Sequence, residues 1–471
     1  MRLGFIFLWS LWFTTLAFGN SVELTSVDGA KIQATVLGRE GDSVSIEKPD
    51  GQRFQVLLAR FSEESKAIIN KVLSSENEAA TLDASVIQTV NGVMGISLLG
   101  EALFWSDRER SVIARLGWPN ESKTDRSSSY RIYPKPDARI LGARPHSAVA
   151  YFSGGLPEMV SIIFANKGDS FKEAPSPGVA LRFIEKAIES DAETIETLLT
   201  KSFGEPRRQS LGEGKETRVR ASRWDVASIS ILLSEKEGEY VGLQILPSEV
   251  ADNRGIAARI SDTEARNQAK GNVERRPNGD VLVGNIPMVD QGPKGYCVPA
   301  TFERYIRYMG LTTDMYLLAL AGQTQAGGGT SPARLLEGVS SMLRRNNRSL
   351  SEIRKMPDMR TVKKYIDEGR PLMWTLFSTS HFNSLSNART HARAAATDWD
   401  EWEKSLREPR RDIKNRSVGT SGAHMALIIG YNDDTGEIAF SDSWGSAYKE
   451  RWLTEEELVA FSQGFNYVID F

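Results

Sequence analysis

The one cysteine of the chain, Cys297, stands where a thiol nucleophile would be activated. It follows the segment Gln291-Gly292-Pro293-Lys294-Gly295-Tyr296 and precedes a stretch with apolar residues at helical spacing, namely Phe302, Tyr305, Ile306 and Met309. Pro299 suits the first turn of a helix, and Gly310 suits its end. Cys297 is therefore predicted at a helix N-terminus, where the helix dipole lowers the pKa of a thiol.

A histidine and an aspartate occur on two strand-like runs farther along the chain. The run 422–431 carries His424, a turn follows at 432–436, and the run 437–442 ends at Asp442. A hairpin turn centred on Asp433 would pair His424 directly with Asp442, about 5 Å apart at Cβ and on one face. Asp442 would then accept a hydrogen bond from Nδ1–H of His424 and stabilise the imidazolium of a Cys–His pair.

Each of these residues has an inert alternative. A lone cysteine is most often buried and unreactive, and a lone histidine in a strand is most often a core residue with satisfied hydrogen bonds. The combination of Cys297, His424 and Asp442 favours a catalytic role over an inert one. It predicts nucleophilic catalysis, with Cys297 as nucleophile, His424 as base and Asp442 as its partner.

These residues resemble the papain-like cysteine peptidases, and most of all the branch with the bacteriocin-leader-processing (double-glycine) peptidases. Gln291 stands six residues before Cys297, where that superfamily has its oxyanion-hole glutamine. Ser441-Asp442-Ser443-Trp444-Gly445 resembles the papain Asn-Ser-Trp-Gly segment, and 369–374 resembles the Gly-x-Pro strand before the histidine strand. The resemblance implies that Gln291 stabilises the oxyanion and that Trp444 covers the His–Asp pair. It covers residues 280–471.

The sequence departs from the papain pattern in two places. Tyr296-Cys297-Val298-Pro299 replaces the Ser-Cys-Trp neighbourhood of papain, so papain-type subsites do not carry over. Residues 378–420 form a long insertion, which is either a solvated helix of mixed charge or a lid over the cleft. In the glycine-rich loop 325–329, Gly328 is a candidate for contact with the substrate backbone, as is Trp444.

Composition excludes several other functions. The chain has 471 residues, 40% hydrophobic and 25% charged, with a net charge of −3, so no chain-wide basic field would bind nucleic acid. One cysteine and four scattered histidines predict no metal site, and no cofactor motif occurs. The expected partner is a peptide or protein substrate.

The N-terminus is typical of a targeting segment. Residues 1–19 combine Arg2 with an apolar run and a small-residue cleavage site, which predicts a signal peptide and an exported protein. An uncleaved membrane anchor is the alternative, although the run is short, and no other stretch reaches membrane length.

The rest of the chain is predicted to be multidomain and α+β. Residues 21–72 alternate short strands with Asp-Gly and Gly-Asp turns and resemble a small SH3-like β-barrel. Residues 84–250 are an α+β region that can be read as two repeats, because predicted helices at 107–116 and 191–203 each end at a Gly-x-Pro segment. Residues 251–279 are predicted to be a charged linker before the papain-like α+β domain.

The sequence thus predicts an exported thiol hydrolase, a cysteine peptidase with a Cys-His-Asp triad. Two alternatives stay open. One is a transglutaminase-like acyltransferase with the same triad. The other is a non-catalytic binding platform.

Overall fold

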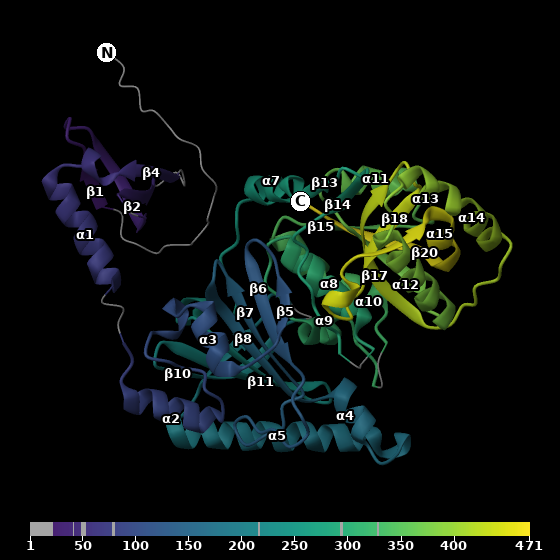
Figure 1. Cartoon of the computed structure of the whole chain (residues 1–471). Helices are drawn as coiled ribbons and strands as arrows, with labels where there is room; N and C mark the ends of the chain where they lie inside the picture. Colours follow the sequence, from purple (N-terminus) through teal and green to yellow (C-terminus); the bar gives the residue numbers. More distant parts are fainter. Residues whose placement is uncertain are drawn as a thin grey trace.

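The structure is a computed structural model, and it describes residues 22–40, 42–48, 53–77, 81–214, 217–292, 295–326 and 329–471. The predicted signal peptide therefore lies outside the described residues. Three parts follow one another along the chain (Figure 1): an N-terminal module, a middle region built on one sheet, and a C-terminal region built on another. Among the helices described, none is long and apolar enough to cross a membrane.

The N-terminal module is a four-stranded antiparallel sheet with one helix against it. Its core consists of alternate strand residues such as Leu24, Val36 and Val44, together with Phe61 and Ile69. The sheet order is β1-β2-β3-β4, so the described residues form an open sheet, and the predicted closed SH3-like barrel is not found among them. The elements are β1 (Val22–Thr25), β2 (Lys31–Glu40), β3 (Ser43–Glu47), β4 (Arg53–Leu57), η1 (Leu58–Arg60) and α1 (Glu63–Asn77).

The middle region is one eight-stranded antiparallel sheet of order β5-β6-β7-β8-β12-β11-β10-β9. Two four-stranded meanders meet at β8 and β12, and a helix that ends at a Gly-x-Pro segment precedes each. This is the arrangement that a repeat would produce, but the duplication itself stays a prediction. The strands are β5 (Asn120–Lys123), β6 (Ser127–Ile132), β7 (Ser147–Ser153), β8 (Leu156–Asn166), β9 (Arg207–Leu211), β10 (Val219–Val226), β11 (Ile229–Lys236) and β12 (Tyr240–Leu246).

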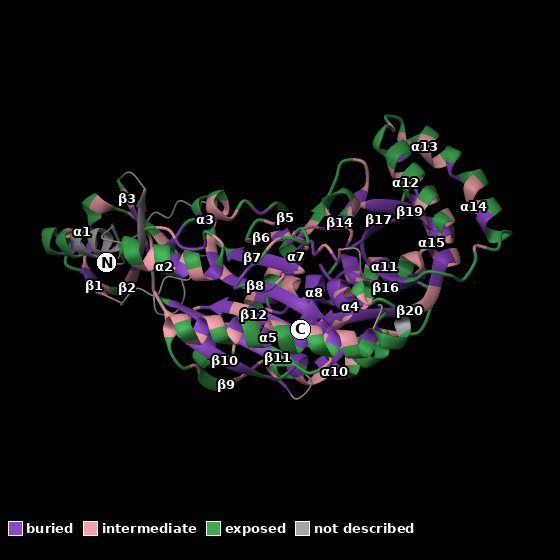
Figure 2. Cartoon of the chain, turned by 90° about the horizontal axis from the view of Figure 1, so that it is seen from below, coloured by how far each residue is buried: buried purple, intermediate pink, exposed green. Residues whose placement is uncertain are grey.

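Helices cover one face of this sheet. The longest buries Ile184, Ile188, Ile195 and Leu199 along one stripe, and Figure 2 shows buried and exposed residues alternating along it. It begins at Ala180, well before the predicted start. The helices are α2 (Ala84–Met94), η2 (Phe104–Ser106), α3 (Glu109–Leu116), α4 (Lys167–Glu173), η3 (Pro177–Val179) and α5 (Ala180–Phe203).

The C-terminal region is an antiparallel sheet of order β13-β14-β17-β16-β20-β15, which β18 and β19 extend from β17. One side of the sheet packs on Phe302 and Ile306 of the helix that begins at Cys297. The other side packs on Val362, Phe382 and other apolar helical residues. The strands are β13 (Val273–Arg275), β14 (Asp280–Val283), β15 (Ser349–Ile353), β16 (Leu372–Phe377), β17 (Ala423–Asn432), β18 (Glu437–Ser441), β19 (Arg451–Thr454) and β20 (Ser462–Asp470).

One helix of this region lies in the segment that was predicted to be a linker, and the short helix α6 (Ser248–Asp252) before it packs on β11 of the middle sheet. The linker prediction for 251–279 is wrong: it holds a helix that buries Ala265 and Ala269, and the edge strand β13. The charged residues of this helix are exposed or partly exposed. The helices are α6 (Ser248–Asp252), α7 (Asp262–Gly271), α8 (Cys297–Tyr308), α9 (Met315–Ala321), α10 (Pro332–Arg345), α11 (Met359–Ile366), α12 (Ser380–Ala394), α13 (Trp399–Ser405), α14 (Arg407–Lys414), η4 (Ser446–Tyr448) and α15 (Glu455–Phe461).

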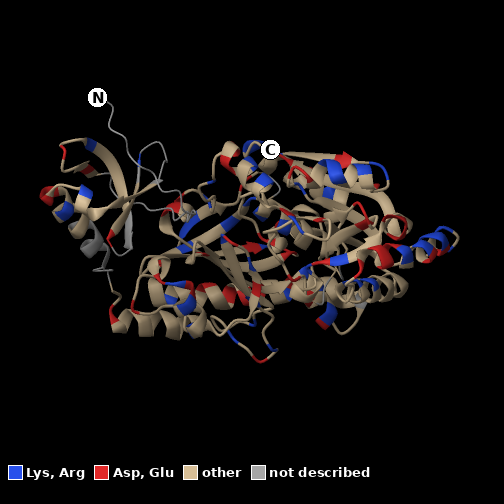
Figure 3. Ribbon diagram, turned by 45° about the horizontal axis from the view of Figure 1, so that its top comes forward, with Lys and Arg blue, Asp and Glu red and all other residues tan. Residues whose placement is uncertain are grey.

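The middle and C-terminal regions share a hydrophobic core. Ile163 and Tyr240 of the middle sheet pack in one cluster with Tyr296, Ala300 and Tyr316 of the C-terminal region. The face of the sheet that α5 leaves uncovered is therefore covered by α8 and α9. Charged residues of both signs occur on every part of the ribbon in Figure 3, in line with the small net charge.

Candidate active site

Cys297 is the first residue of α8, and its thiol is half-buried. One turn farther on, Thr301 Oγ1 donates a hydrogen bond of 3.1 Å to the carbonyl oxygen of Met425. Met425 directly follows His424 in β17. The first turn of α8 is thus attached to the strand that carries the histidine, and this holds Cys297 and His424 together.

His424 and Asp442 lie side by side, with 2.8 Å between Nε2 and Oδ1. The direct pairing predicted for the hairpin is wrong, because Leu427 pairs with Ser441. Continuing this register by one residue places Asp442 opposite Ala426, so His424 is its diagonal neighbour on the same face. The strand β17 contains a bulge between Ile428 and Gly430, and this bulge sets that register.

The ring nitrogen of His424 that contacts Asp442 differs from the predicted one. Asp442 binds Nε2, not Nδ1. The imidazole also interacts with the Cys297 thiol, and since Nε2 is engaged by Asp442, this interaction falls to Nδ1. The side chains of Cys297, His424 and Asp442 therefore form one continuous series of polar interactions.

The environment of these side chains favours a charged pair. Burial opposes ionisation of the Cys297 thiol, but the hydrogen bond and charge of His424 outweigh it and lower the pKa of Cys297. Burial also opposes the imidazolium, but Asp442 and Cys297 together raise the pKa of His424 to about 9. Each charge therefore stabilises the other, because the imidazolium favours the thiolate and the thiolate favours the imidazolium.

Asp442 is a fully buried carboxylate with two cationic partners. Its Oδ2 lies 2.6 Å from Nη1 of Arg451, which comes from β19. Burial would raise the pKa of Asp442, but His424 and Arg451 outweigh it, and the pKa is lowered. Asp442 therefore stays ionised at neutral pH and can balance the imidazolium.

Arg451 is itself enclosed by the insertion 378–420. Its Nη2 donates to Ser386 Oγ and, at 2.9 Å, to Asn387 Oδ1, both on α12. The rings of Phe382 and Phe440 flank its guanidinium at 5.5 and 5.1 Å. Helix α12 thus holds Arg451 in place, and Arg451 in turn binds Asp442, the carboxylate partner of His424.

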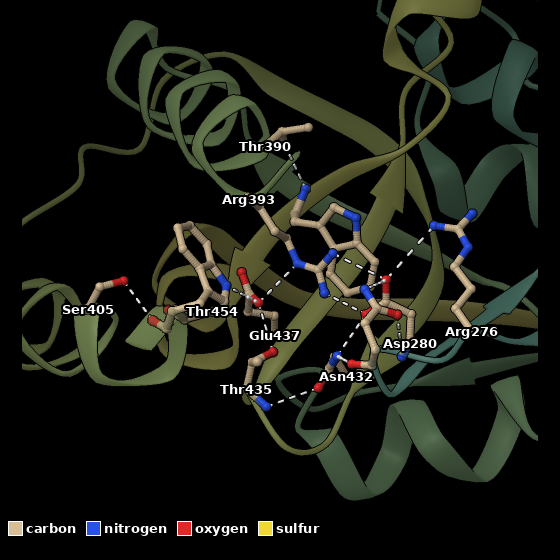
Figure 4. A network of polar contacts seen from close by, with 12 residues as sticks. Arg276, Asp280, Thr390, Arg393, Ser405, Asn432, Thr435, Glu437 and Thr454 are labelled. Carbon is tan, nitrogen blue, oxygen red and sulfur yellow. Dashed lines mark hydrogen bonds and ion pairs between the residues drawn. The ribbon is translucent and has the colours of Figure 1, made fainter. Parts of the chain in front are cut away.

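The same insertion has two parts: the mixed-charge helices α13 and α14 are largely exposed, in line with the solvated-helix alternative, whereas α12 is packed into the domain. Arg393 of α12 is buried and pairs with Asp280 at 2.5 Å and with Glu437 at 3.0 Å, and Figure 4 shows the network around these ion pairs. A helix held by buried ion pairs is part of the packed domain, neither a movable lid nor a solvated helix. Helices α13 and α14 lie at the end of the C-terminal region that is remote from the middle region (Figure 1).

Trp444 stacks on His424, with ring centroids 4.7 Å apart and an angle of 27° between the planes. It is partly exposed, so it covers one face of the imidazole against water while its other side can meet a ligand. Tyr448 contacts Trp444 edge-on. This arrangement fits the predicted role of Trp444 over the His–Asp pair.

Gln291 lies in the loop that enters α8 and is 8% exposed. Its backbone N–H donates to the carbonyl oxygen of Ser443, 2.9 Å away and next to Asp442. Arg304 of α8 ties the same loop to the same strand end, because it donates to the carbonyl oxygens of Pro287 and Ser441. Gly328, the weak substrate-contact candidate, lies outside the described residues.

Two contributions to the site were missed from the sequence. Arg451 was not singled out, although a charged residue at the head of the apolar strand Arg451-Trp452-Leu453 is unusual and could have been noticed. The other contribution comes from the middle region, where Tyr133 and Glu121 hydrogen bond to the backbone of Asp290, and no pattern in the sequence indicates these contacts. Among the described residues, no cluster of His, Cys, Asp and Glu could hold a metal ion.

Comparison with known proteins places this site in a family. Residues 283–467 match the model of the Peptidase_C39 like family. These residues are called the Peptidase_C39-like region below because of this similarity. The resemblance to the double-glycine branch of the papain-like peptidases is thereby confirmed for it, and the family indicates a cysteine peptidase.

A solved structure is similar to part of the chain. It is the peptidase domain of Streptococcus ComA, described as a bi-functional ABC transporter involved in a quorum sensing pathway. The identity is 13%, the match covers 39% of this chain and 96% of that one, and the TM-score is 0.25. A likeness this distant carries no argument about substrate. The comparison with curated proteins gave no match.

Proposed function

We propose that the protein is an exported cysteine peptidase in which the Peptidase_C39-like region hydrolyses amide bonds. The observation that carries the proposal is the unbroken series of contacts from the Cys297 thiol through His424 to Asp442 and Arg451. A buried, inert cysteine needs neither a histidine partner nor a balanced pair of charges behind it.

The reaction begins with the thiolate–imidazolium pair. The Cys297 sulfur attacks the acyl carbon, a C–S bond forms, and the electrons of the carbonyl π bond move to the oxygen. The oxyanion is stabilised by the Gln291 side chain and the backbone N–H of Cys297. The tetrahedral intermediate then expels the amine, which takes the proton from His424.

Deacylation repeats these steps with water. His424 accepts a proton from the water molecule as its oxygen attacks the thioester carbon, and Cys297 leaves as thiolate. The imidazolium is regenerated, and the acid product departs. Throughout, Asp442 holds the imidazole in place and balances its charge, while Trp444 excludes water from one face of the ring.

The experiment uses a thiol-directed activity probe and a library of peptides. Labelling of Cys297 above the level of a denatured control, with peptide cleavage that is lost in Cys297→Ala, is the expected result. Absence of labelling would contradict both enzymatic readings and favour a binding platform. Product masses separate the other alternative, because an acyltransferase joins the acyl group to an added amine in place of water.

Export is tested separately by sequencing the N-terminus of the mature protein. A new N-terminus near residue 20 is expected from cleavage of the predicted signal peptide. An intact Met1 on a membrane-bound chain would favour the uncleaved anchor.

A further inference from the structure

We propose that the middle region completes the active site, and that Tyr133 of this region is a positioning residue for Gln291. The inference rests on the proposed function, in which Gln291 stabilises the oxyanion. Its basis is a set of contacts between the middle sheet and the loop 285–292. A Peptidase_C39-like region begins at residue 283 in this chain, yet part of what holds its catalytic loop comes from residues 121–133.

Tyr133 contacts the residues on both sides of Gln291. Its hydroxyl donates a hydrogen bond of 2.5 Å to the carbonyl oxygen of Asp290. Its ring lies against Gly292, where an added Cβ would stand only 2.7 Å from the ring carbon that bears the hydroxyl. Gly292 also has φ of 64°, so the close approach and the backbone conformation both require glycine there. Tyr133 is the residue that this glycine accommodates.

One peptide group is thereby held from two directions. The carbonyl of Asp290 and the N–H of Gln291 belong to the same peptide unit, whose atoms are coplanar. The carbonyl accepts from Tyr133 of the middle region, and the N–H donates to Ser443 of the Peptidase_C39-like region. The orientation of this plane determines where the Gln291 side chain starts. Both regions therefore set the direction of the proposed oxyanion donor.

The loop is bound at two further backbone positions by strand β5. The N–H of Asp290 donates to Glu121 Oε1 at 2.8 Å, and the N–H of Met288 donates to Ser122 Oγ at 2.9 Å. Burial is the main cause that raises the pKa of Tyr133 well above its usual value, so its hydroxyl keeps the proton that it donates. The contacts are thus a row of hydrogen bonds along the loop.

A buried ionic network anchors this row to α8 as well. Arg131 pairs with Glu121 at 2.5 Å and donates to Tyr151, whose hydroxyl donates to Glu303 of α8 at 2.7 Å. The side chains of Arg131 and Glu121 are each 2% exposed. Arg131 Nη2 also lies 3.9 Å from Glu303, so this buried network crosses from the middle region to α8. The loop 285–292 and helix α8 are consequently both held by the middle region.

These contacts affect the rate of acyl transfer because they hold the oxyanion donor Gln291 in its working orientation before the reaction begins. An oxyanion donor is effective when it already points to where the charge develops, and small displacements of such a group are costly. Removing the Tyr133 hydroxyl frees one side of the Asp290–Gln291 peptide group. The thiolate–imidazolium pair does not depend on this peptide group. Acyl transfer should therefore suffer while the reactivity of the thiol does not.

The test compares Tyr133→Phe with Tyr130→Phe in the full chain. Tyr130 lies three residues earlier, in β6, and its hydroxyl bonds to Glu109 within the middle region, so Tyr130→Phe likewise removes one partly buried hydroxyl hydrogen bond. In Tyr133→Phe we expect kcat for peptide cleavage to fall roughly tenfold, with the rate of Cys297 alkylation by iodoacetamide changed less than about twofold. Tyr130→Phe should alter neither. A purely structural role would lower kcat and alkylation together.

Hydrogen exchange provides a readout that needs no substrate. The amide of Gln291 should exchange faster in Tyr133→Phe than in the wild type, and at the wild-type rate in Tyr130→Phe. Equal exchange in all three proteins would overturn the inference, as would faster exchange with unchanged kcat. If the wild type cleaves no peptide, the proposed function fails, while the exchange rates still decide whether Tyr133 holds the loop.

Discussion

Arg451 lies 2.6 Å from Oδ2 of Asp442, on the side of the carboxylate opposite to the oxygen that binds His424. The Asp442 carboxylate is therefore shared between Arg451, which is always charged, and His424, which is charged only when protonated. With Cys297 as thiolate and His424 as imidazolium, the charges of these four side chains sum to zero. A buried cluster without net charge avoids the large cost of an unbalanced charge.

Replacement of Arg451 should shift the reactivity of the thiol to higher pH. In Arg451→Met the thiolate state would carry a net charge of −1 in a buried site, so the pKa of Cys297 should rise. Alkylation of Cys297 near pH 7 is expected to slow about tenfold, and unfolding by urea should show a loss of about 3–5 kcal/mol. Arg451→Lys keeps the charge and should show a smaller shift in the pH profile.

Arg389→Met is the control for this variant. Arg389 is on the same helix α12 as the partners of Arg451, and it forms an ion pair of 2.6 Å with the buried Glu457. Its replacement should lower stability without moving the pH profile of alkylation. If Arg451→Met also leaves the profile in place, then Arg451 supports the fold alone.

Asp442→Asn should slow alkylation of Cys297 near neutrality by more than tenfold, which corresponds to about 1.4 kcal/mol. An amide oxygen can still accept a hydrogen bond from Nε2–H of His424, but it cannot balance the imidazolium charge. The imidazolium would also face Arg451 without the carboxylate between them. The rate of alkylation is measured against pH for both proteins, and superimposable curves would show that Asp442 only orients the ring.

The pH dependence of peptide cleavage should be bell-shaped with an upper limb near pH 9. The folded pKa of His424 is raised to about 9 from 6.5, so the imidazolium is retained below this value and lost as the pH rises through it. The acid limb should lie below the usual thiol pKa of 9.0, because the pKa of Cys297 is lowered. Alkylation needs only the thiolate and should not decline above pH 9. A decline of both rates together would point to unfolding.

Cys297→Ala should abolish labelling and cleavage with the fold intact. The two side chains differ little in size, and the thiol lies at the margin of the core, so the loss of stability should be about 1 kcal/mol. Thermal unfolding of the variant measures this loss directly. A collapse in the melting temperature would show that Cys297 serves packing more than chemistry.

Local patterns were enough to predict several parts of the site. The helical spacing after Cys297 and the position of Pro299 indicated the N-terminus of α8. The mostly apolar run after Gly422 indicated a buried strand, and the turn residues after Asn432 indicated the return strand that leads to Asp442. Such signals succeed because apolar periodicity and turn chemistry act over a few neighbouring residues.

The exact partners across the hairpin depended on the bulge in β17. Asn432 pairs with Glu437 and Tyr431 with Ile438, and this register carried on without a break would put Asp442 opposite Leu427. Leu427 is three residues from His424, so the two would face opposite sides of the sheet. The bulge at Ile429 shifts the register by one residue and returns Asp442 to the face of His424.

Arg451, α12 and Tyr133 belong to what only the tertiary structure decided. Each contacts the site or its entry loop from a segment that is far away in sequence, as Tyr133 does with Asp290 and Ser386 with Arg451. Hydrophobic patterning determines which side of a strand or helix is buried, but it does not determine which buried polar groups contact one another. The residue types of the chemistry were therefore readable along the chain, whereas its charge balance and its support were set by folding.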